Sequence, residues 1–388
     1  MMTAATIVFA ASLEAVASFG SNPGNLAMYR YVPPAAPPGA PLVVVLHGCN
    51  QTAADIAQLG WNELADRWRF TVAYPEQKTA NNSLRCFNWA GEYGDTSNLV
   101  RGQGENESIK QMVDRMKADY AIDTNRVYIT GLSGGGAQTT LMLALWPDVF
   151  AAGAPIAGIP YDCTTALGEV ASCLSPGRDR TPAEWGDLVR AAHVPPYGGR
   201  WPRLQIWQGA GDTVVKPMNQ TEILEQFANV VGIDTTADAS STVGTLTRAE
   251  YRDAAGATLI ETMTVAGMDH GAALDPMNGC GTAGPYRLAV GVCSTELIAR
   301  FFGLAPAGAP DPVDGGSPPP PDRTDGGGAP DDGGAVDGGA PDDGGAAPAP
   351  SGCSTGGHPA AEALALVVVA ALALLVRARR ARDVGHAR

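Results

Sequence analysis

One stretch near the middle of the chain limits the fold more than any other. Val127–Thr130 is β-branched and aromatic, which is typical of a buried strand, and the Ala, Leu and Met residues within 137–145 favour a helix. Between them, Gly131-Leu-Ser-Gly-Gly135 fits the G-x-S-x-G pattern of a sharp strand-to-helix turn. Glycines suit this turn because a Cβ would clash where strand and helix approach closely. The turn exposes the Ser133 hydroxyl beside the free N–H groups of a helix N-terminus. We interpret Ser133 as a nucleophile; an ordinary glycine-rich loop is the alternative.

Segments typical of strands and helices alternate through the first 300 residues. Apolar runs predict strands at 26–32, 41–46, 70–74, 127–130, 150–159, 203–207 and 258–265. In addition to the helix after Ser133, helical periodicity predicts helices at 52–68, 107–120, 182–192, 219–231 and 296–302. The run 41–46 is apolar throughout, as expected of a strand buried on both faces of a parallel sheet. The alternation predicts an α/β fold, with a mostly parallel sheet and helices on both faces.

The remaining segments are less regular. Pro75 is expected to end the strand 70–74, and residues 76–104 are expected to form a long loop. Residues 160–200 have little periodicity and predict an insertion over the sheet. Residues 249–265 predict a hairpin with Gly256 near its turn.

A serine hydroxyl is a weak nucleophile and needs an imidazole to accept its proton. The chain has five histidines: His47, His193, His270, His358 and His386. The last two lie in the C-terminal tail, His193 lies in the irregular insertion, and His47 follows a buried strand, where it would shape a loop. Because His270 is late in the chain and follows a predicted strand, we expect it to be the base. A histidine in a surface loop is the alternative.

An acid that orients the imidazole is expected after a strand between the serine and the histidine. Asp212 follows the strand 203–207, although an aspartate in a solvated turn would also fit there. Other aspartates lack such a strand or adjoin the base in sequence: Asp187, Asp234, Asp238 and Asp269. Because the chemistry of parallel sheets gathers at the carboxyl ends of the strands, Ser133, Asp212 and His270 are expected to meet. Their order along the chain is that of α/β-hydrolases.

Acyl transfer also needs two N–H donors for the oxyanion. We expect the N–H of Gly134, which follows the nucleophile, and the N–H of Cys49, in the loop after the strand 41–46. Cys49 as a thiol nucleophile fits less well, and a disulfide there would brace the loop. Trp89 and Tyr161 are candidates to line a substrate cleft, with packing in the core or a loop as the alternative.

Six of the seven cysteines lie between residues 20 and 305. Their spacing matches no metal site, so we expect neither a metal nor a cofactor. An even number in a chain that looks exported favours disulfides. The sequence leaves the pairing open, but short spacings favour Cys163–Cys173 and Cys280–Cys293, which leaves Cys49–Cys86.

Composition divides the chain into a domain at 20–305, long enough for a large core, a Gly-, Pro-, Ala- and Asp-rich flexible linker at 306–352, and a tail at 353–388. The tail contains Cys353, an uncharged apolar segment at 363–376 that is short for a membrane span, and an arginine cluster.

Residues 1–19 resemble the core of a signal peptide without the basic residues that usually precede it. The net charge of −14 argues against nucleic acid as a partner, and membrane contact is expected through the tail only.

Seven short motifs share the pattern of one known family. They are His47-Gly-Cys-Asn-Gln51, Gly60-Trp-Asn-Glu-Leu-Ala-Asp66, Tyr74-Pro-Glu-Gln77, Cys86-Phe-Asn-Trp89, Ser108-Ile-Lys-Gln-Met-Val113, Gly131-Leu-Ser-Gly-Gly135 and Ala154-Pro-Ile-Ala-Gly158. Together they resemble the esterase/poly(3-hydroxybutyrate) depolymerase family, which is similar to acetyl xylan and feruloyl esterases. The resemblance covers about residues 17–303. It implies an extracellular α/β-hydrolase, with a triad at Ser133, Asp212 and His270 and an oxyanion hole at Cys49 and Gly134. Before the acid, the family often has His-Gly where this chain has Gln208-Gly209.

The end of the chain resembles a second known element. Gly352-Cys353-Ser354, the apolar segment and the arginines are similar to the C-terminal sorting tail of myxobacterial surface proteins, which implies processing near Cys353. A plain single-span anchor is the alternative.

The sequence therefore predicts a secreted or surface-tethered serine carboxylesterase, similar to poly(3-hydroxybutyrate) depolymerases, whose partner is an ester substrate. One alternative is an acetyl xylan or feruloyl esterase that acts on hemicellulose. An alternative of another class is a non-catalytic surface binding protein on a hydrolase scaffold.

Overall fold

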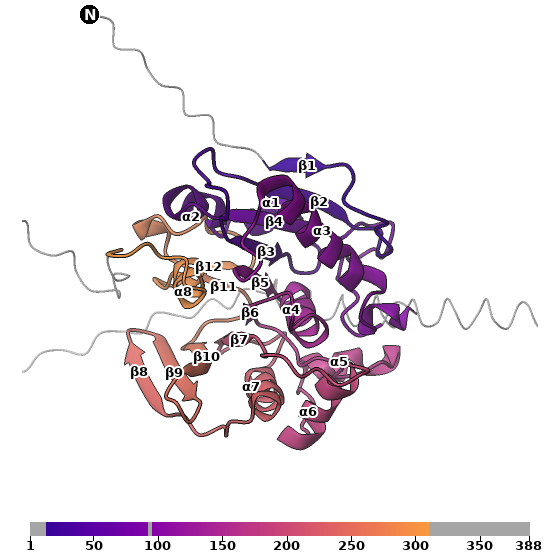
Figure 1. Cartoon of the computed structure of the whole chain (residues 1–388). Coiled ribbons are helices and arrows are strands. Elements are labelled where there is room, and N and C mark those ends of the chain that lie inside the picture. The colour runs from indigo at the N-terminus through magenta and orange to yellow at the C-terminus, as the bar shows by residue number, and fades with distance from the viewer. Residues whose placement is uncertain (1–12, 92–94, 310–388) are drawn as a thin grey trace, which may run out of the picture. The chain divides into compact units, whose positions relative to one another are not determined.

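A ten-stranded sheet lies at the centre of the computed structural model, which describes residues 13–91 and 95–309 (Figure 1). Its strands are β1 Glu14–Val16, β2 Ala27–Tyr31, β3 Leu42–Leu46, β4 Thr71–Glu76, β5 Val127–Leu132, β6 Ala152–Ile156, β7 Arg203–Gly209, β8 Ala239–Val243, β9 Leu246–Arg252 and β10 Thr258–Val265. They are arranged in the order β1-β2-β4-β3-β5-β6-β7-β10-β9-β8. The run from β4 to β10 is parallel, and the strands outside it pair antiparallel. β11 Ala272–Leu274 and β12 Arg287–Ala289 form a separate parallel pair.

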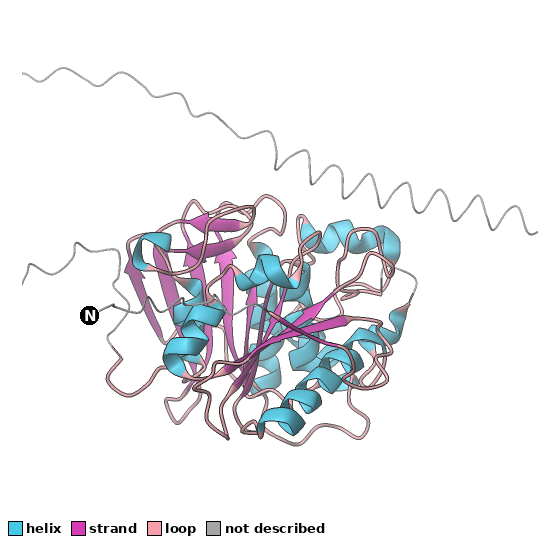
Figure 2. Cartoon of the chain, turned by 90° about the horizontal axis from the view of Figure 1, so that it is seen from above, coloured by secondary structure: helices cyan, strands magenta, loops and turns pink. Residues whose placement is uncertain are grey.

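Helices cover both faces of this sheet (Figure 2). They are α1 Ala53–Ala57, α2 Trp61–Trp68, α3 Gly104–Tyr120, α4 Gly134–Leu145, α5 Val170–Leu174, α6 Pro182–Ala191, α7 Met218–Val231 and α8 Ser294–Phe301, with short 3-10 turns η1 Thr96–Leu99, η2 Leu167–Glu169 and η3 Pro276–Asn278. Successive side chains of β3 point to opposite faces. Leu42 and Val44 join the core of α3, α4 and α7, whereas Val43 and Val45 join that of α1, α2 and α8. The predicted α/β fold is confirmed.

Residues 13–91 and 95–309 all belong to one compact unit. Glu14–Val16, within the segment that resembles a signal peptide, pairs antiparallel with β2, and Glu14 forms an ion pair with Arg30 at 2.6 Å. Residues 1–12, most of the predicted linker, Cys353, the apolar segment 363–376 and the arginine cluster lie outside the described residues. Within residues 13–91 and 95–309, no helix is both long enough and apolar enough to cross a membrane.

The structure differs from the sequence prediction in its local detail. The predicted helix 52–68 is divided into α1 and α2 at Gly60, whose φ of 92° lies outside the helical region. β4 continues through Pro75, because its pairing with β3 ends at Ala73 and a missing N–H removes no bond to that neighbour. β8 is rich in Ser and exposed, so it carries no hydrophobic pattern that predicts it.

The first turn of α4 lies against the backbone of the neighbouring strands. A Cβ added to Gly135 would lie 2.5 Å from the carbonyl oxygens of Leu46 and His47. A Cβ added to Gly131 would lie 2.4 Å from the carbonyl oxygen of Gly135. Both distances are far shorter than any van der Waals contact. Glycine is therefore required at both positions for the helix to begin directly at the edge of the sheet.

We predict that Gly135→Ala destabilises the protein by about 3 kcal/mol, because backbone atoms cannot yield to the added methyl group as a flexible side chain would. Urea unfolding followed by tryptophan fluorescence measures the change. Gly168→Ala is the control, since a Cβ there meets nothing within 4 Å, and it should alter stability by less than about 0.5 kcal/mol. Equal stabilities for the two variants would contradict the packing argument.

Candidate active site

Ser133 lies in the turn between β5 and α4, with φ 58° and ψ −120°. A positive φ strains any residue that has a Cβ. The neighbouring elements hold the turn, because the Ser133 N–H donates to the carbonyl of Ile156 at 2.9 Å and its carbonyl accepts from Ala137 N–H at 2.9 Å. The hydroxyl is thereby fixed at the carboxyl edge of the sheet.

Three side chains from separate loops form one hydrogen-bonded series. Ser133 Oγ lies 2.9 Å from His270 Nε2, and His270 Nδ1 lies 2.8 Å from Asp212 Oδ2. Because a carboxylate can only accept, Nδ1 carries the proton and Nε2 accepts from the Ser133 hydroxyl. His270 is 8% exposed and Asp212 is 2% exposed, so water competes weakly for these bonds. The structure thus brings together the three side chains that were predicted to meet.

Asp212 is fixed by donors on both of its carboxylate oxygens. Oδ1 accepts from the N–H groups of Val214 and Val215 at 2.9 and 2.8 Å. Oδ2 accepts from Gln208 Nε2 at 3.1 Å as well as from His270. Gln208 is itself held, since it also donates to the Val215 carbonyl at 2.9 Å. A side-chain donor therefore occupies the position where the resembled family often has histidine.

Asp269 connects the loop of the acid with the loop of the base. Its Oδ1 accepts from the N–H and hydroxyl of Thr213 and from the N–H of His270, at 2.8–3.0 Å. Partial burial raises its pKa, but these donors outweigh burial and hold the pKa of Asp269 below its ordinary value. Asp269 thus bonds to backbone around the base, while Asp212 bonds to the imidazole ring.

Two backbone N–H groups lie close to the turn that holds Ser133. One belongs to Gly134, the first residue of α4, and the other to Cys49, whose nitrogen would be 3.8 Å from a Cβ placed on Gly134. The Cys49 loop also approaches the serine itself, since a Cβ on Gly48 would lie 3.4 Å from Ser133 Cβ. Neither N–H donates to an acceptor within the described part of the chain. Both donors are therefore available to an oxygen bound at Ser133.

His47 fixes the direction of the Cys49 N–H. Its Nε2 accepts from the Gln77 N–H at 3.0 Å, so Nδ1 carries the proton and donates to the Gly48 carbonyl at 2.7 Å. That carbonyl and the Cys49 N–H belong to one planar peptide unit and point in opposite directions. The bond that holds the carbonyl therefore aims the N–H the other way. A disulfide, Cys49–Cys86, braces the same loop.

The two aromatic residues predicted to line a cleft are both almost buried. Trp89 is 5% exposed and packs in a small apolar cluster with Ala137 and Val215, beside the serine helix and the acid loop. Tyr161 is also 5% exposed, and its hydroxyl donates to the Leu99 carbonyl at 3.0 Å. Among the residues described, neither side chain hydrogen-bonds to Ser133 or His270, and neither ring stacks on the His270 imidazole.

Tyr286 contacts the imidazole although no sequence motif pointed to it. Its ring meets His270 edge-on, with ring centroids 5.9 Å apart. It belongs to the loop that the disulfide Cys280–Cys293 closes. The predicted disulfide Cys280–Cys293 closes a loop that follows His270 in the chain. That loop is the signal that would have pointed to Tyr286.

The three disulfides have the pairing that the spacing favoured: Cys49–Cys86, Cys163–Cys173 and Cys280–Cys293. For the described ranges, the structure contains no group of His, Cys, Asp and Glu side chains that could hold a metal ion.

Comparisons with known proteins show that the chain is similar to ester hydrolases. Residues 26–252 match the sequence profile of the family described as "Esterase PHB depolymerase". The chain is 51% identical over 313 residues to poly(3-hydroxyalkanoate) depolymerase C of Paucimonas lemoignei, covering 78% of this chain and 74% of the relative. It is 37% identical over 241 residues to feruloyl esterase B of Neurospora crassa, covering 60% and 79%. An acetyl xylan esterase structure from Aspergillus awamori is similar with a TM-score of 0.65 and 25% identity, covering 76% of this chain and 100% of that one.

The burial of His47 predicts a pH dependence of stability. Burial lowers its pKa to about 4 from an ordinary 6.5. Above pH 6.5 the ring is neutral in both the folded and unfolded states; between 6.5 and 4 only the unfolded state takes up the proton. Protonation of His47 in the unfolded state should therefore lower the free energy of unfolding by about 3 kcal/mol as the pH falls from 6.5 to 4. Below pH 4 this residue should cause no further loss.

Urea unfolding of the wild type and His47→Gln at a series of pH values between 7.5 and 4 tests this. The variant should be less stable at pH 7 and should lose less stability on acidification. Parallel pH profiles would rule out His47 as the source of the acid sensitivity.

Proposed function

The chain belongs to the esterase PHB depolymerase family, and from that premise we propose that it is a serine carboxylesterase that cleaves an aliphatic polyester through an acyl-enzyme. The observation that carries the proposal is the bonded series of Ser133, His270 and Asp212. It supplies a nucleophile, a base of fixed tautomer and an acid that orients the base. The free N–H groups of Cys49 and Gly134 supply the donors for the oxyanion.

In the proposed acylation, Ser133 Oγ attacks the ester carbonyl carbon while its proton passes to His270 Nε2. Asp212 holds the ring and stabilises the imidazolium that forms. The former carbonyl oxygen becomes negatively charged and accepts from the Cys49 and Gly134 N–H groups. The carbon–oxygen bond to the alcohol then breaks, and Nε2 returns the proton to the departing oxygen.

Deacylation repeats these steps with water. His270 accepts a proton from the water as its oxygen attacks the acyl carbon. The intermediate collapses, Ser133 Oγ leaves with the proton, and the carboxylic acid is released. One ester and one water thus give one acid and one alcohol, and no metal or cofactor is needed to balance the reaction.

The relatives named above support two substrate classes. A poly(3-hydroxyalkanoate) depolymerase is 51% identical over most of its length, which favours polyester. A feruloyl esterase at 37% identity and an acetyl xylan esterase of similar structure favour hemicellulose as the second candidate. Rates on poly(3-hydroxybutyrate) suspension, acetylated xylan, methyl ferulate and p-nitrophenyl butyrate separate them. A preference for either hemicellulose ester would overturn the polyester assignment.

We extend the proposal to the site of action. Three disulfides are expected in an oxidising compartment, which supports an extracellular or cell-surface enzyme. The signal-like segment at the start and the sorting tail at the end remain predictions from sequence. Mass spectrometry of the protein from culture medium and cell envelope would show whether the chain is exported and whether it is cleaved near Cys353.

We predict that Ser133→Ala lowers kcat on p-nitrophenyl butyrate by roughly ten-thousandfold or more, because the acyl-enzyme can no longer form. Ser172→Ala, an exposed serine on α5, should keep wild-type activity. A fluorophosphonate probe should label the wild type and not Ser133→Ala. If the folded wild type neither hydrolyses any ester nor takes the label, the non-catalytic binding hypothesis replaces the enzyme.

We predict that Gln208→Leu lowers kcat about tenfold with little change in KM, since it removes a donor that orients Asp212 and touches no substrate. Gln226→Leu is the matched control. Gln226 is also buried and also bonds to backbone, at Tyr161, so it should cost comparable stability but leave kcat near wild type. Equal losses of kcat in both variants would mean that general destabilisation, not the orientation of Asp212, is responsible.

A further inference from the structure

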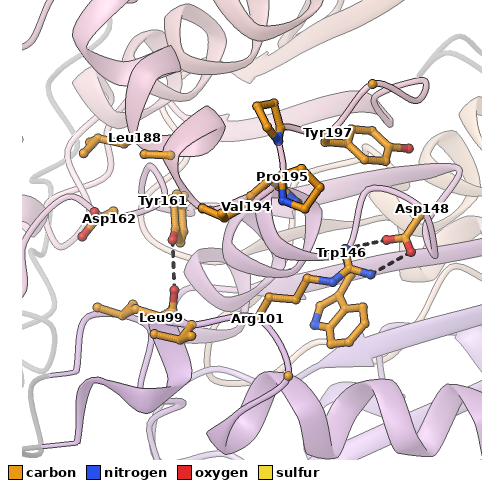
Figure 3. A pocket seen from close by; sticks show the side chains of 17 residues that line it. Leu99, Arg101, Trp146, Asp148, Tyr161, Asp162, Leu188, Val194, Pro195 and Tyr197 are labelled. Atoms are coloured by element: carbon orange, nitrogen blue, oxygen red, sulfur yellow. Dashed lines mark hydrogen bonds and ion pairs between the residues drawn. The ribbon is translucent and has the colours of Figure 1, made fainter.

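A groove of about 920 Å³ lies on the described domain outside the active site (Figure 3). One wall is the end of η1 and the segment after it, with Leu99, Val100 and Arg101. The other is formed by Leu188 of α6 and by the end of that helix and the segment after it, 191–198. Trp146 and Tyr161 form part of its lining. Ser133, Asp212 and His270 are absent from this lining.

The groove and the nucleophile lie toward opposite ends of α4. Ser133 precedes the first residue of the helix, and Trp146 follows its last. With a rise of 1.5 Å per residue, the two are roughly 20 Å apart. A small ester bound at Ser133 therefore cannot reach the far part of the groove, whereas a polymer chain can span such a distance.

The rim of the groove exposes apolar side chains to solvent. Among the residues described, four large hydrophobic side chains are strongly exposed, and two of them belong to this groove: Val194 at 94% and Val100 at 49%. Pro195 and Pro196 continue the exposed apolar surface beside Val194. Such a gathering of exposed apolar groups at a concavity indicates a binding surface.

Most polar groups of the groove are already bonded within the protein. Arg101 donates to both carboxylate oxygens of Asp148 at 2.7 Å and lies over the Trp146 ring (Figure 3). His193 Nε2 donates to the Ala144 carbonyl at 2.7 Å. The hydroxyl groups of Tyr161 and Tyr197 donate to the carbonyls of Leu99 and Arg200. Asp162 remains as a half-buried carboxyl whose pKa is raised by burial.

This distribution favours one kind of occupant. A polysaccharide brings many hydroxyl groups, which need polar partners when water is removed. An aliphatic polyester has no donors, and its surface is mostly hydrocarbon, so a groove with an apolar rim and internally satisfied polar groups suits it.

We propose that this groove, which we call the α4 groove, binds a segment of an aliphatic polyester chain as a second site apart from the catalytic centre. The proposal rests on the proposed function. Holding one part of the polymer in the groove raises the effective concentration of neighbouring ester bonds at Ser133. A small ester has no second part to hold and gains nothing.

The test uses the full chain and the substitution Val194→Asp, which places a charge on the rim where the side chain is 94% exposed and packing is little affected. Its control is Val243→Asp, the same change at an exposed position of β8. Adsorption to poly(3-hydroxybutyrate) particles and to acetylated xylan is measured together with the rates on the polyester and on p-nitrophenyl butyrate. We expect V194D to weaken adsorption to the polyester about tenfold. We expect it to lower the ratio of the polymer rate to the small-ester rate by about the same factor. V243D should retain both wild-type values.

Each other outcome is decisive. Unchanged adsorption of V194D, or equal losses in V194D and V243D, would overturn the groove as a specific site. Loss of adsorption to acetylated xylan alone would assign the groove to polysaccharide and overturn the polyester. If the wild type hydrolyses no ester but its adsorption depends on Val194, the groove stands and the proposed function fails. If it hydrolyses small esters but does not adsorb to the polyester, the groove fails and the esterase stands.

Discussion

The contact between the first turn of α4 and the backbone of β3 and β5 is the constraint on which the site depends. At Gly131 and Gly135 the available space is smaller than a methyl group, because carbonyl oxygens lie 2.4–2.5 Å from where a Cβ would be. This approach leaves no room for a gradual turn, so Ser133 adopts a positive φ of 58°. The strain is tolerated because backbone bonds to β6 and α4 fix the residue from both sides. The serine is thereby held in place before any substrate binds.

The same contact explains why the Cys49 loop is so firmly held. With α4 lying directly on the end of β3, the next residues of the chain, from His47 onward, must pass close beside Ser133. Their peptide units must present N–H groups to the nucleophile, because a carbonyl oxygen pointing there would repel a developing oxyanion. The neutral His47 ring, the Gln51 side chain that accepts from the Gly48 N–H, and the disulfide to Cys86 all act on this loop. Fixed donors need no rearrangement when negative charge forms.

The residues that the sequence predicted and those it missed differ in a physical way. Ser133, Asp212 and His270 each follow a strand, and the carboxyl ends of parallel strands meet at one edge, so local patterns were sufficient. Asp269 and Tyr286 act through contacts between separate loops, which no local pattern encodes. Gln208, at the end of β7, acts on Asp212 only four residues later, but no sequence pattern shows that its side chain points at the carboxylate. Tyr161 was selected for its aromatic ring, but the chain after β6 returns along α4, as the bond from Thr140 to the Ile159 carbonyl shows, and places Tyr161 in the α4 groove.

The groove and the candidate active site are joined by a rigid element rather than by a mobile one. His193 Nε2 and Arg101 donate to the carbonyls of Ala144 and Leu145, the last residues of α4, which have no partner within a helix. Two residues that line the groove therefore also cap the helix that begins at Ser133. Since α4 is buried along its whole length, its two ends keep a fixed separation. A polymer segment in the α4 groove would accordingly present ester bonds to Ser133 at a distance set by the helix, which requires no conformational change to couple the two sites.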